Sequence, residues 1–159
     1  MIQRIQTLYL FLACVLCVFC MTQPVGFFIS EQGGQMAVMY NLLLRYTPQL
    51  GVTGLQAEHF VTVPMFVVLL IVGSLSFFNI FLFRRRALQM RICSFSIILL
   101  VAWYALYAFY IYRQGNGLEA SFRPGWAAAL PFCAIVFLYF AFRGILKDEM
   151  LVKSLDRLR

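Results

Sequence analysis

Long apolar runs separated by short polar stretches dominate the sequence. Four of these runs are long enough to cross a membrane, and they cover about residues 8–29, 60–83, 92–112 and 124–142. A membrane-spanning helix needs roughly 20 apolar residues, and none of the four runs contains Asp, Glu, Lys, Arg or His. Their apolar residues are continuous rather than periodic, which favours membrane spans over the core of a soluble domain. Because lipid offers no backbone partners, each span must be a helix.

The runs predict an all-α integral membrane protein, a four-helix transmembrane bundle that forms a single domain over residues 1–159. Composition agrees, because 12% of the residues are charged, against about 25% in an ordinary soluble domain. Residues 30–58 are predicted to form a small external cap. Turn residues such as Gly33-Gly34 and Thr47-Pro48 favour a hairpin there, and a short amphipathic helix over Met36 to Arg45 is the alternative.

The distribution of basic residues predicts the orientation. Of the 13 Lys and Arg residues, ten fall on one side of the predicted spans and three on the other. The larger group comprises Arg4, Arg84, Arg85, Arg86, Arg91, Arg143, Lys147, Lys153, Arg157 and Arg159, and the smaller comprises Arg45, Arg113 and Arg123. The richer side is expected to be cytoplasmic, which places both termini in the cytoplasm, N-in/C-in.

The basic run between the second and third spans is the main topology signal. Arg84, Arg85, Arg86 and Arg91 lie there. Each basic residue near an anionic leaflet contributes about 1 kcal/mol. We therefore expect these four arginines to fix the topology and to contact the anionic inner leaflet of the lipid bilayer.

One feature inside the predicted spans favours helix packing, and a second has two interpretations. Gly73, Ser76 and Asn79 form a small and polar stripe of the kind that brings helices close and bonds across them. The aromatic residues Trp103, Tyr104, Tyr107, Tyr110 and Tyr112 are predicted to belong mostly to an interfacial aromatic belt. A cofactor or quinone cleft lined by Tyr104 and Tyr107 is the alternative.

Glycine and proline residues are predicted to set the limits and the shape of the third and fourth spans. Gly115-Asn116-Gly117 predicts a tight turn, and Pro124 is predicted to begin the fourth span. Pro131 is predicted to kink that span, because proline removes one backbone hydrogen bond.

The first span carries three cysteines in a C-x2-C-x2-C pattern. Cys14, Cys17 and Cys20 recur every three residues and are predicted to lie close to one stripe of the helix. A thiol or quinone redox protein using Cys14 and Cys17 is one interpretation. Reactive thiols need an electropositive, partly exposed setting, whereas a free cysteine in an apolar helix behaves as a small hydrophobe. Packing is the favoured interpretation, with no metal site and no cofactor.

The C-terminal tail, residues 143–159, predicts a cytoplasmic amphipathic helix. Its apolar residues fall on one helical face, and the late basic residues suit the helix dipole. Such a helix either lies on the inner leaflet or docks a protein partner. The candidate partner surface comprises Leu151, Lys153, Leu155, Arg157, Leu158 and Arg159.

The two ends of the chain resemble an uncharacterised family of small four-span inner-membrane proteins of Bacteroidota, a domain-of-unknown-function family. The residues that carry the resemblance are Ile2-Gln3-Arg4-Ile5-Gln6-Thr7-Leu8-Tyr9-Leu10, Asp148-Glu149, Leu151-Val152-Lys153-Ser154 and Asp156-Arg157-Leu158-Arg159. The resemblance implies four spans in a Gram-negative inner membrane and supplies no catalytic residues. Both ends lie on the predicted cytoplasmic side, where we expect any shared function.

The sequence disfavours several classes of function. The chain has no H-E-x-x-H, G-x-S-x-G or P-loop motif, and one histidine and six carboxylates leave little for acid–base chemistry. An ion-coupled transporter needs ionisable residues inside its spans, and none of the four predicted spans has one. Nucleic acid binding needs a folded basic face, whereas the basic residues here flank the spans. The prediction is a non-enzymatic scaffold or accessory subunit of a larger envelope complex. Its partners would be the lipid bilayer and a membrane or cytoplasmic protein.

Overall fold

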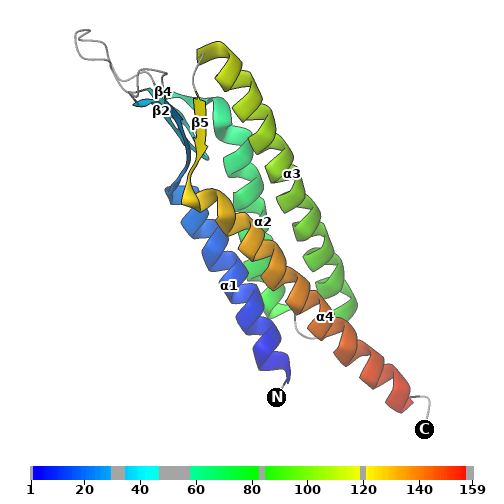
Figure 1. The fold of residues 1–159 in the computed structure, drawn as a ribbon. Helices are drawn as coiled ribbons and strands as arrows, with labels where there is room; N and C mark the ends of the chain where they lie inside the picture. The colour runs from blue at the N-terminus through cyan, green and yellow to red at the C-terminus, as the bar shows by residue number, and fades with distance from the viewer. Residues whose placement is uncertain (1, 30–34, 47–57, 83–84, 119–120, 157–159) are drawn as a thin grey trace.

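The computed structural model describes residues 2–29, 35–46, 58–82, 85–118 and 121–156, with the backbone alone described for 2–4, 35–36, 58–59, 115–118 and 152–156. In these ranges four long helices stand side by side, with a small sheet at one end (Figure 1). The helices are α1 (Ile2–Thr22), α2 (Val63–Phe81), α3 (Arg86–Leu118) and α4 (Leu130–Asp156). We call the end near both chain termini the terminal end and the opposite end the sheet end.

Each helix turns one face inward along a seven-residue repeat. Its buried positions alternate between spacings of four and three residues, the pattern of helices packed as in a coiled coil. These positions are Gln6, Leu10, Ala13, Cys17 and Cys20 in α1; Met65, Leu69, Val72, Ser76 and Asn79 in α2; Gln89, Cys93, Ser96, Leu100, Trp103, Tyr107 and Tyr110 in α3; and Ala134, Leu138, Ala141, Ile145 and Asp148 in α4. Helices α1 and α3 each pack against both α2 and α4.

The outer faces of the helices are as apolar as the inner ones. Large side chains such as Phe78, Ile98 and Phe132 are each 62% exposed. All four helices are long and apolar enough to cross a membrane. In a membrane protein lipid covers such side chains, so the apolar residues alone do not reveal which face is inside.

The sheet has five antiparallel strands in the order β4-β3-β2-β1-β5 among the described residues. They are β1 (Pro24–Ile29), β2 (Gln35–Tyr40), β3 (Leu44–Tyr46), β4 (Glu58–His59) and β5 (Ser121–Pro124). Strand β5 comes from the connection between α3 and α4 and pairs with β1, which directly follows α1. The two connections at the sheet end are thereby joined into one structure.

The prediction of an all-α protein is therefore wrong at this end, and the first predicted span, 8–29, is too long. Helix α1 stops at Thr22, and residues 24–29 form β1. Proline lacks the backbone N–H that a helix needs and disfavours helical geometry in the preceding residue, so Pro24 ends the helix. Gly26 fits the strand because a Cβ atom there would collide with the ring of Phe122 on β5.

The cap over residues 30–58 contains strands, and the alternative of a helix over Met36 to Arg45 is wrong. In β2 the buried side chains of Ala37 and Met39 alternate with half-buried Val38 and Tyr40, as on a pleated strand. Strand β2 pairs with β3. The turn residues Gly33-Gly34 and Thr47-Pro48 lie outside the described residues.

The boundaries of the second and third helices also differ from the prediction. The second begins with a short 3₁₀ turn, Phe60–Thr62, before α2. Helix α3 extends beyond the predicted 92–112 at both ends, and its last turns include the backbone of 115–117, where a tight turn was predicted. Glycine near a helix C-terminus is common, because the chain leaves the helix there.

The predicted fourth span, 124–142, starts too early and stops too early. Pro124 ends β5, a 3₁₀ turn follows at Trp126–Ala129, and α4 begins at Leu130. Pro131 is the second residue of α4, where a missing N–H costs no hydrogen bond, so the predicted kink within a longer helix is replaced by a helix start. Helix α4 then continues without a break to Asp156, and the predicted tail is an extension of it rather than a separate helix.

Candidate functional site at the terminal end of the bundle

Among the side chains that the structure describes, each helix places a buried polar one at the inner position nearest the terminal end. These side chains are Gln6 of α1, Asn79 of α2, Gln89 of α3 and Asp148 of α4. They continue the seven-residue repeat of the apolar core. Because these four positions are polar instead of apolar, we call them the polar layer. Buried polar groups are costly unless they are hydrogen-bonded, and this layer is held together by contacts between helices.

The strongest contact joins the two ends of the chain. The side-chain amide Nε2 of Gln6 donates to Oδ2 of Asp148 at 2.7 Å. Both side chains are more than nine-tenths buried. Gly144, one turn earlier on α4, makes room, because a Cβ there would lie 3.1 Å from Cγ of Gln6. A buried hydrogen bond to a charged group contributes about 1.5–3 kcal/mol, so this contact fixes α1 against α4.

A second contact holds α4 at the same residue. The guanidinium of Arg86, at the start of α3, donates to the backbone carbonyl oxygen of Asp148 at 3.2 Å. Asp148 is thus held through its side chain by α1 and through its backbone by α3. These two contacts set the position of α4 where it leaves the bundle.

The other two polar residues of the layer form a reciprocal pair between α2 and α3. Asn79 Nδ2 donates to the Gln89 carbonyl oxygen, and Gln89 Nε2 donates to the Asn79 carbonyl oxygen, both at 3.3 Å. Asn79 Nδ2 also lies 3.1 Å from the sulfur of Cys93. The pair closes the short connection between the two helices. It confirms that Asn79 of the predicted stripe bonds across helices, and Gly73 packs close to Cys17 of α1.

Beyond the polar layer, α4 extends further than the other helices. In Figure 1 its last turns project past the ends of α1, α2 and α3. Met150 is 57% exposed and Leu151 is 50% exposed in this extension. The extension therefore presents large apolar side chains on a helix that the polar layer holds in place.

The residues joined by this layer fall within one family match. The sequence model of the family described as Domain of unknown function (DUF4293) matches residues 2–158. The chain belongs to this family. The DUF4293 match includes both partners of the Gln6–Asp148 hydrogen bond and the whole described part of the α4 extension. Curated proteins give no significant match to the chain.

The four predicted topology arginines do not share one environment. Arg85 and Arg91 are exposed, whereas Arg86 is half-buried and bonded to α4. Arg84 lies outside the described residues. Arg86 is thus a structural donor as well as a basic residue, a role that the charge pattern alone did not indicate.

The predicted partner surface is described only in part. Leu151 is exposed, and Lys153 and Leu155 lie in α4, where only the backbone is described. Arg157, Leu158 and Arg159 lie outside the described residues. The sequence analysis did not assign a role to Gln6, Gln89 or Asp148. The sequence feature that could have identified them is their spacing, since each continues the repeat of inner positions at one end of its helix.

A second polar network, at the sheet end, was not predicted. The indole N–H of Trp103 donates to Asn41 Oδ1 at 3.1 Å, and Asn41 Nδ2 donates to the Cys20 carbonyl oxygen at 2.6 Å. The Cys20 thiol in turn donates to the carbonyl oxygen of Ala127 at 3.5 Å. Asn41 follows β2 directly, so this network fastens the sheet to three helical segments.

The aromatic residues of α3 also hold the sheet end to the helices. Tyr107 donates to the carbonyl oxygen of Val25, and Tyr104 donates to that of Ala128, both at 2.8 Å. The rings of Trp103 and Tyr107 stack at 5.3 Å between centroids. Trp103 and Tyr107 are buried, so the prediction that they belong to an interfacial belt is wrong. The tyrosine hydroxyls serve as packing contacts of the fold.

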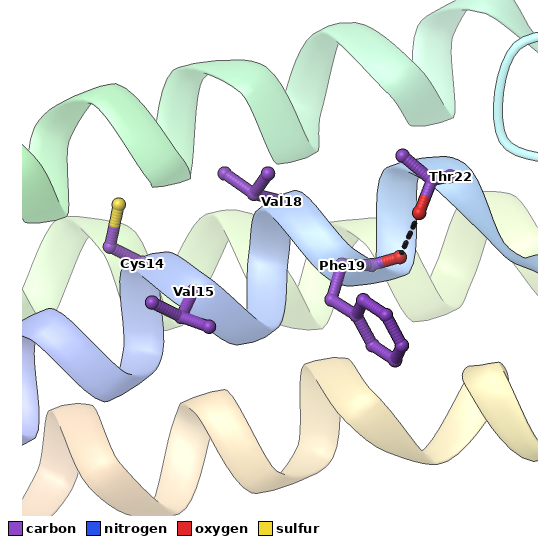
Figure 2. Close-up of a pocket in the computed structure, with 5 residues that line it drawn as sticks. All are labelled: Cys14, Val15, Val18, Phe19 and Thr22. Carbon is purple, nitrogen blue, oxygen red and sulfur yellow. Dashed lines mark hydrogen bonds between the residues drawn. The ribbon is translucent and has the colours of Figure 1, made fainter.

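The three cysteines of α1 divide between two environments. Cys17 and Cys20 lie in the core, whereas Cys14 is half-exposed. Cys14 borders an apolar groove of about 300 Å³ on the outer face of α1, with Val15, Val18, Phe19 and Thr22 (Figure 2). The Thr22 hydroxyl donates to the Phe19 carbonyl oxygen, so the groove wall is essentially apolar. The three thiols therefore do not present one common stripe.

Metal ligation has no candidate in the part of the chain that the structure describes. No group of three or more His, Cys, Asp or Glu residues lies close enough there to hold an ion.

Proposed function

We propose that this DUF4293 chain is a non-enzymatic protein of a bacterial inner membrane, a scaffold or accessory subunit that acts by binding a protein partner. The four long apolar helices and their exposed apolar side chains support a membrane location. The buried apolar side chains of the described helices form one core cluster inside the bundle. What the molecule offers to a partner is therefore its surface.

The proposed orientation places the terminal end in the cytoplasm. Both chain termini and the basic α2–α3 connection lie at this end, and positive charge near spans favours the cytoplasmic side. The exposed Arg85, Arg91, Arg143 and Lys147 would meet the anionic inner leaflet. A reporter active only in the cytoplasm should work when fused after Arg159 and fail within Ser30 to Glu58.

The observation that carries the proposed function is the continuous α4 extension held by the polar layer. A helix with no tertiary contacts is marginal in water below about 12–15 residues. Here the extension is the direct continuation of a packed helix, fixed at Asp148 by Gln6 and Arg86. A preorganised helix loses less conformational entropy on binding than a flexible tail. It is therefore well suited to dock in a groove of a cytoplasmic or membrane protein.

Site-specific photocrosslinking in cells tests this proposal. A photoreactive phenylalanine analogue would replace Leu151 in the extension, and Phe132 in α4 would serve as a matched control facing lipid. We expect a discrete protein adduct from position 151 and only lipid adducts from position 132. If position 151 gives the same lipid adducts as position 132, the extension does not dock a protein.

A second variant distinguishes a protein partner from the bilayer. Arg157→Lys preserves charge but removes the planar guanidinium fork. We expect it to weaken the protein adduct at position 151, because a protein site recognises the geometry of that group. A polybasic contact with lipid phosphates would tolerate this change.

A redox function remains the alternative interpretation of Cys14 and Cys17. The two thiols would have to share a reactant, whereas Cys17 lies in the core and Cys14 borders the outer groove. Trapping the thiols in intact membranes and measuring their oxidation separates the two functions. A redox pair would be found partly oxidised, and a packing role leaves both thiols reduced.

A further inference from the structure

Three side-chain oxygens inside the bundle have no hydrogen-bond partner among the described protein atoms near the terminal end. They are Ser76 Oγ, Asn79 Oδ1 and Ser96 Oγ, and all three residues are completely buried. A fourth such oxygen, Thr62 Oγ1, belongs to the opposite end of α2. Buried polar groups are nearly always paired with protein or ordered water, so a cluster of three requires a partner.

The three oxygens belong to one stretch of the α2–α3 interface. Ser76 and Asn79 lie one turn apart on the inner face of α2. Asn79 Nδ2 lies 3.1 Å from the sulfur of Cys93 on α3, and Ser96 is one turn further along α3. The two helices run antiparallel from a short connection. Ser76, one turn from Asn79 on α2, therefore lies beside Ser96, one turn from Cys93 on α3.

The orientation of the Asn79 amide follows from its partners. Its Nδ2 faces the carbonyl oxygen of Gln89, which only accepts hydrogen bonds. Exchanging the nitrogen and oxygen would oppose two acceptors, so Oδ1 must be the atom directed away from Gln89. The cluster thus offers one amide acceptor and two hydroxyl groups that both donate and accept.

We propose that bound water occupies this part of the α2–α3 interface, with Asn79 Oδ1, Ser76 Oγ and Ser96 Oγ as its ligands. A buried water typically makes about three hydrogen bonds to otherwise unpaired polar groups, which is what this cluster supplies. The three ligands are neutral, and hard cations such as Ca²⁺ take six or more oxygens. Water is the ligand whose chemistry fits, and it bridges α2 and α3 inside the apolar bundle.

X-ray hydroxyl-radical footprinting of the full chain in nanodiscs tests the site. Irradiation converts bound water to hydroxyl radicals, which oxidise neighbouring thiols to sulfinic and sulfonic acids. Cys93 and Cys17 are equally and completely buried, but only Cys93 contacts Asn79. We expect several-fold more oxidation at Cys93 than at Cys17. Equal oxidation of the two thiols would overturn the proposal, because a dry interface protects both.

Variants on the same helices give the matched control. Ser76→Ala combined with Ser96→Ala should lower the oxidation of Cys93 to the level of Cys17. Ser74→Ala combined with Ser94→Ala changes two exposed serines of the same helices and should leave it unchanged. Persistent oxidation of Cys93 in the first variant would contradict the assigned ligands. The comparison of Cys93 with Cys17 in the unaltered chain decides the proposal if that variant does not fold.

Discussion

The two ends of the bundle are held by different chemistry. At the sheet end, neutral groups such as Trp103, Asn41 and Tyr107 bond to one another or to backbone carbonyls and fasten a sheet to the helices. At the terminal end, the carboxylate of Asp148 is buried against Gln6, and α4 continues past it. The strands cover the sheet end, whereas at the terminal end α4 extends beyond the other helices. This difference is why we place the binding function at the terminal end.

The largest effect is expected from the central aromatic residue of the sheet end. Trp103→Ala should lower the free energy of unfolding by about 3–5 kcal/mol, because it creates a cavity and leaves Asn41 without its donor. The other tryptophan, Trp126, is 57% exposed, and Trp126→Ala should stay within about 0.5 kcal/mol. Unfolding in a graded series of SDS–detergent mixtures measures both. Equal losses would show that the sheet-end network does not stabilise the fold.

A smaller loss is expected at the terminal end. Gln6→Leu should lower the free energy of unfolding by about 1–3 kcal/mol, because it leaves the buried Asp148 carboxylate without its donor. Asp148→Asn keeps an acceptor oxygen for Gln6 and should cost less than Gln6→Leu. Hydrogen exchange should increase around Asp148 in α4 and remain unchanged in β1 and β2. An increase throughout the sheet would mean that the two ends are not independent.

A still smaller difference should separate two arginines of α3. Arg86→Gln removes the donor to the Asp148 carbonyl oxygen and should cost about 1 kcal/mol. Arg91→Gln removes an equal charge from an exposed side chain and should stay within about 0.5 kcal/mol. Matching losses of unfolding free energy in the two variants would reduce the role of Arg86 to its charge.

The smallest effect is expected between the two ends, at the outer groove. Cys14→Ser changes a half-exposed side chain that makes no described contact with either polar network. We expect unchanged unfolding and an unchanged photocrosslink at position 151. Loss of the adduct with normal protein levels would instead favour the redox interpretation of Cys14.

The sequence predicted the four apolar helices because each run is long and continuous. It did not predict β1, because Val25, Phe27, Phe28 and Ile29 are as apolar as the span before them. Only Thr22-Gln23-Pro24 interrupts the run, and a proline near the end of a run also fits a helix that bends. Strand β1 pairs with the nearby β2 and also with β5, nearly 100 residues later in the chain, and the second pairing leaves no local signal.

The terminal site was predictable in part. The resemblance directed attention to the two ends of the chain, and the structure joins Gln6 to Asp148 there. The inner repeat was concealed because the exposed side chains of the helices are also apolar. Gln89 and Asp148 lie near basic residues at the ends of apolar runs, a context typical of ordinary polar flanks of spans. Their burial follows only from the positions of neighbouring helices.

A truncation that preserves the polar layer tests the central claim most directly. A chain ending after Met150 keeps Asp148 and its bonds to Gln6 and Arg86 but lacks the whole candidate partner surface. It would be compared with the full chain in a deletion strain, with protein levels and insertion measured in parallel. We predict four inserted helices, an unchanged sheet end and no rescue of the deletion phenotype. Full rescue by the truncated chain would contradict the assignment of function to the α4 extension.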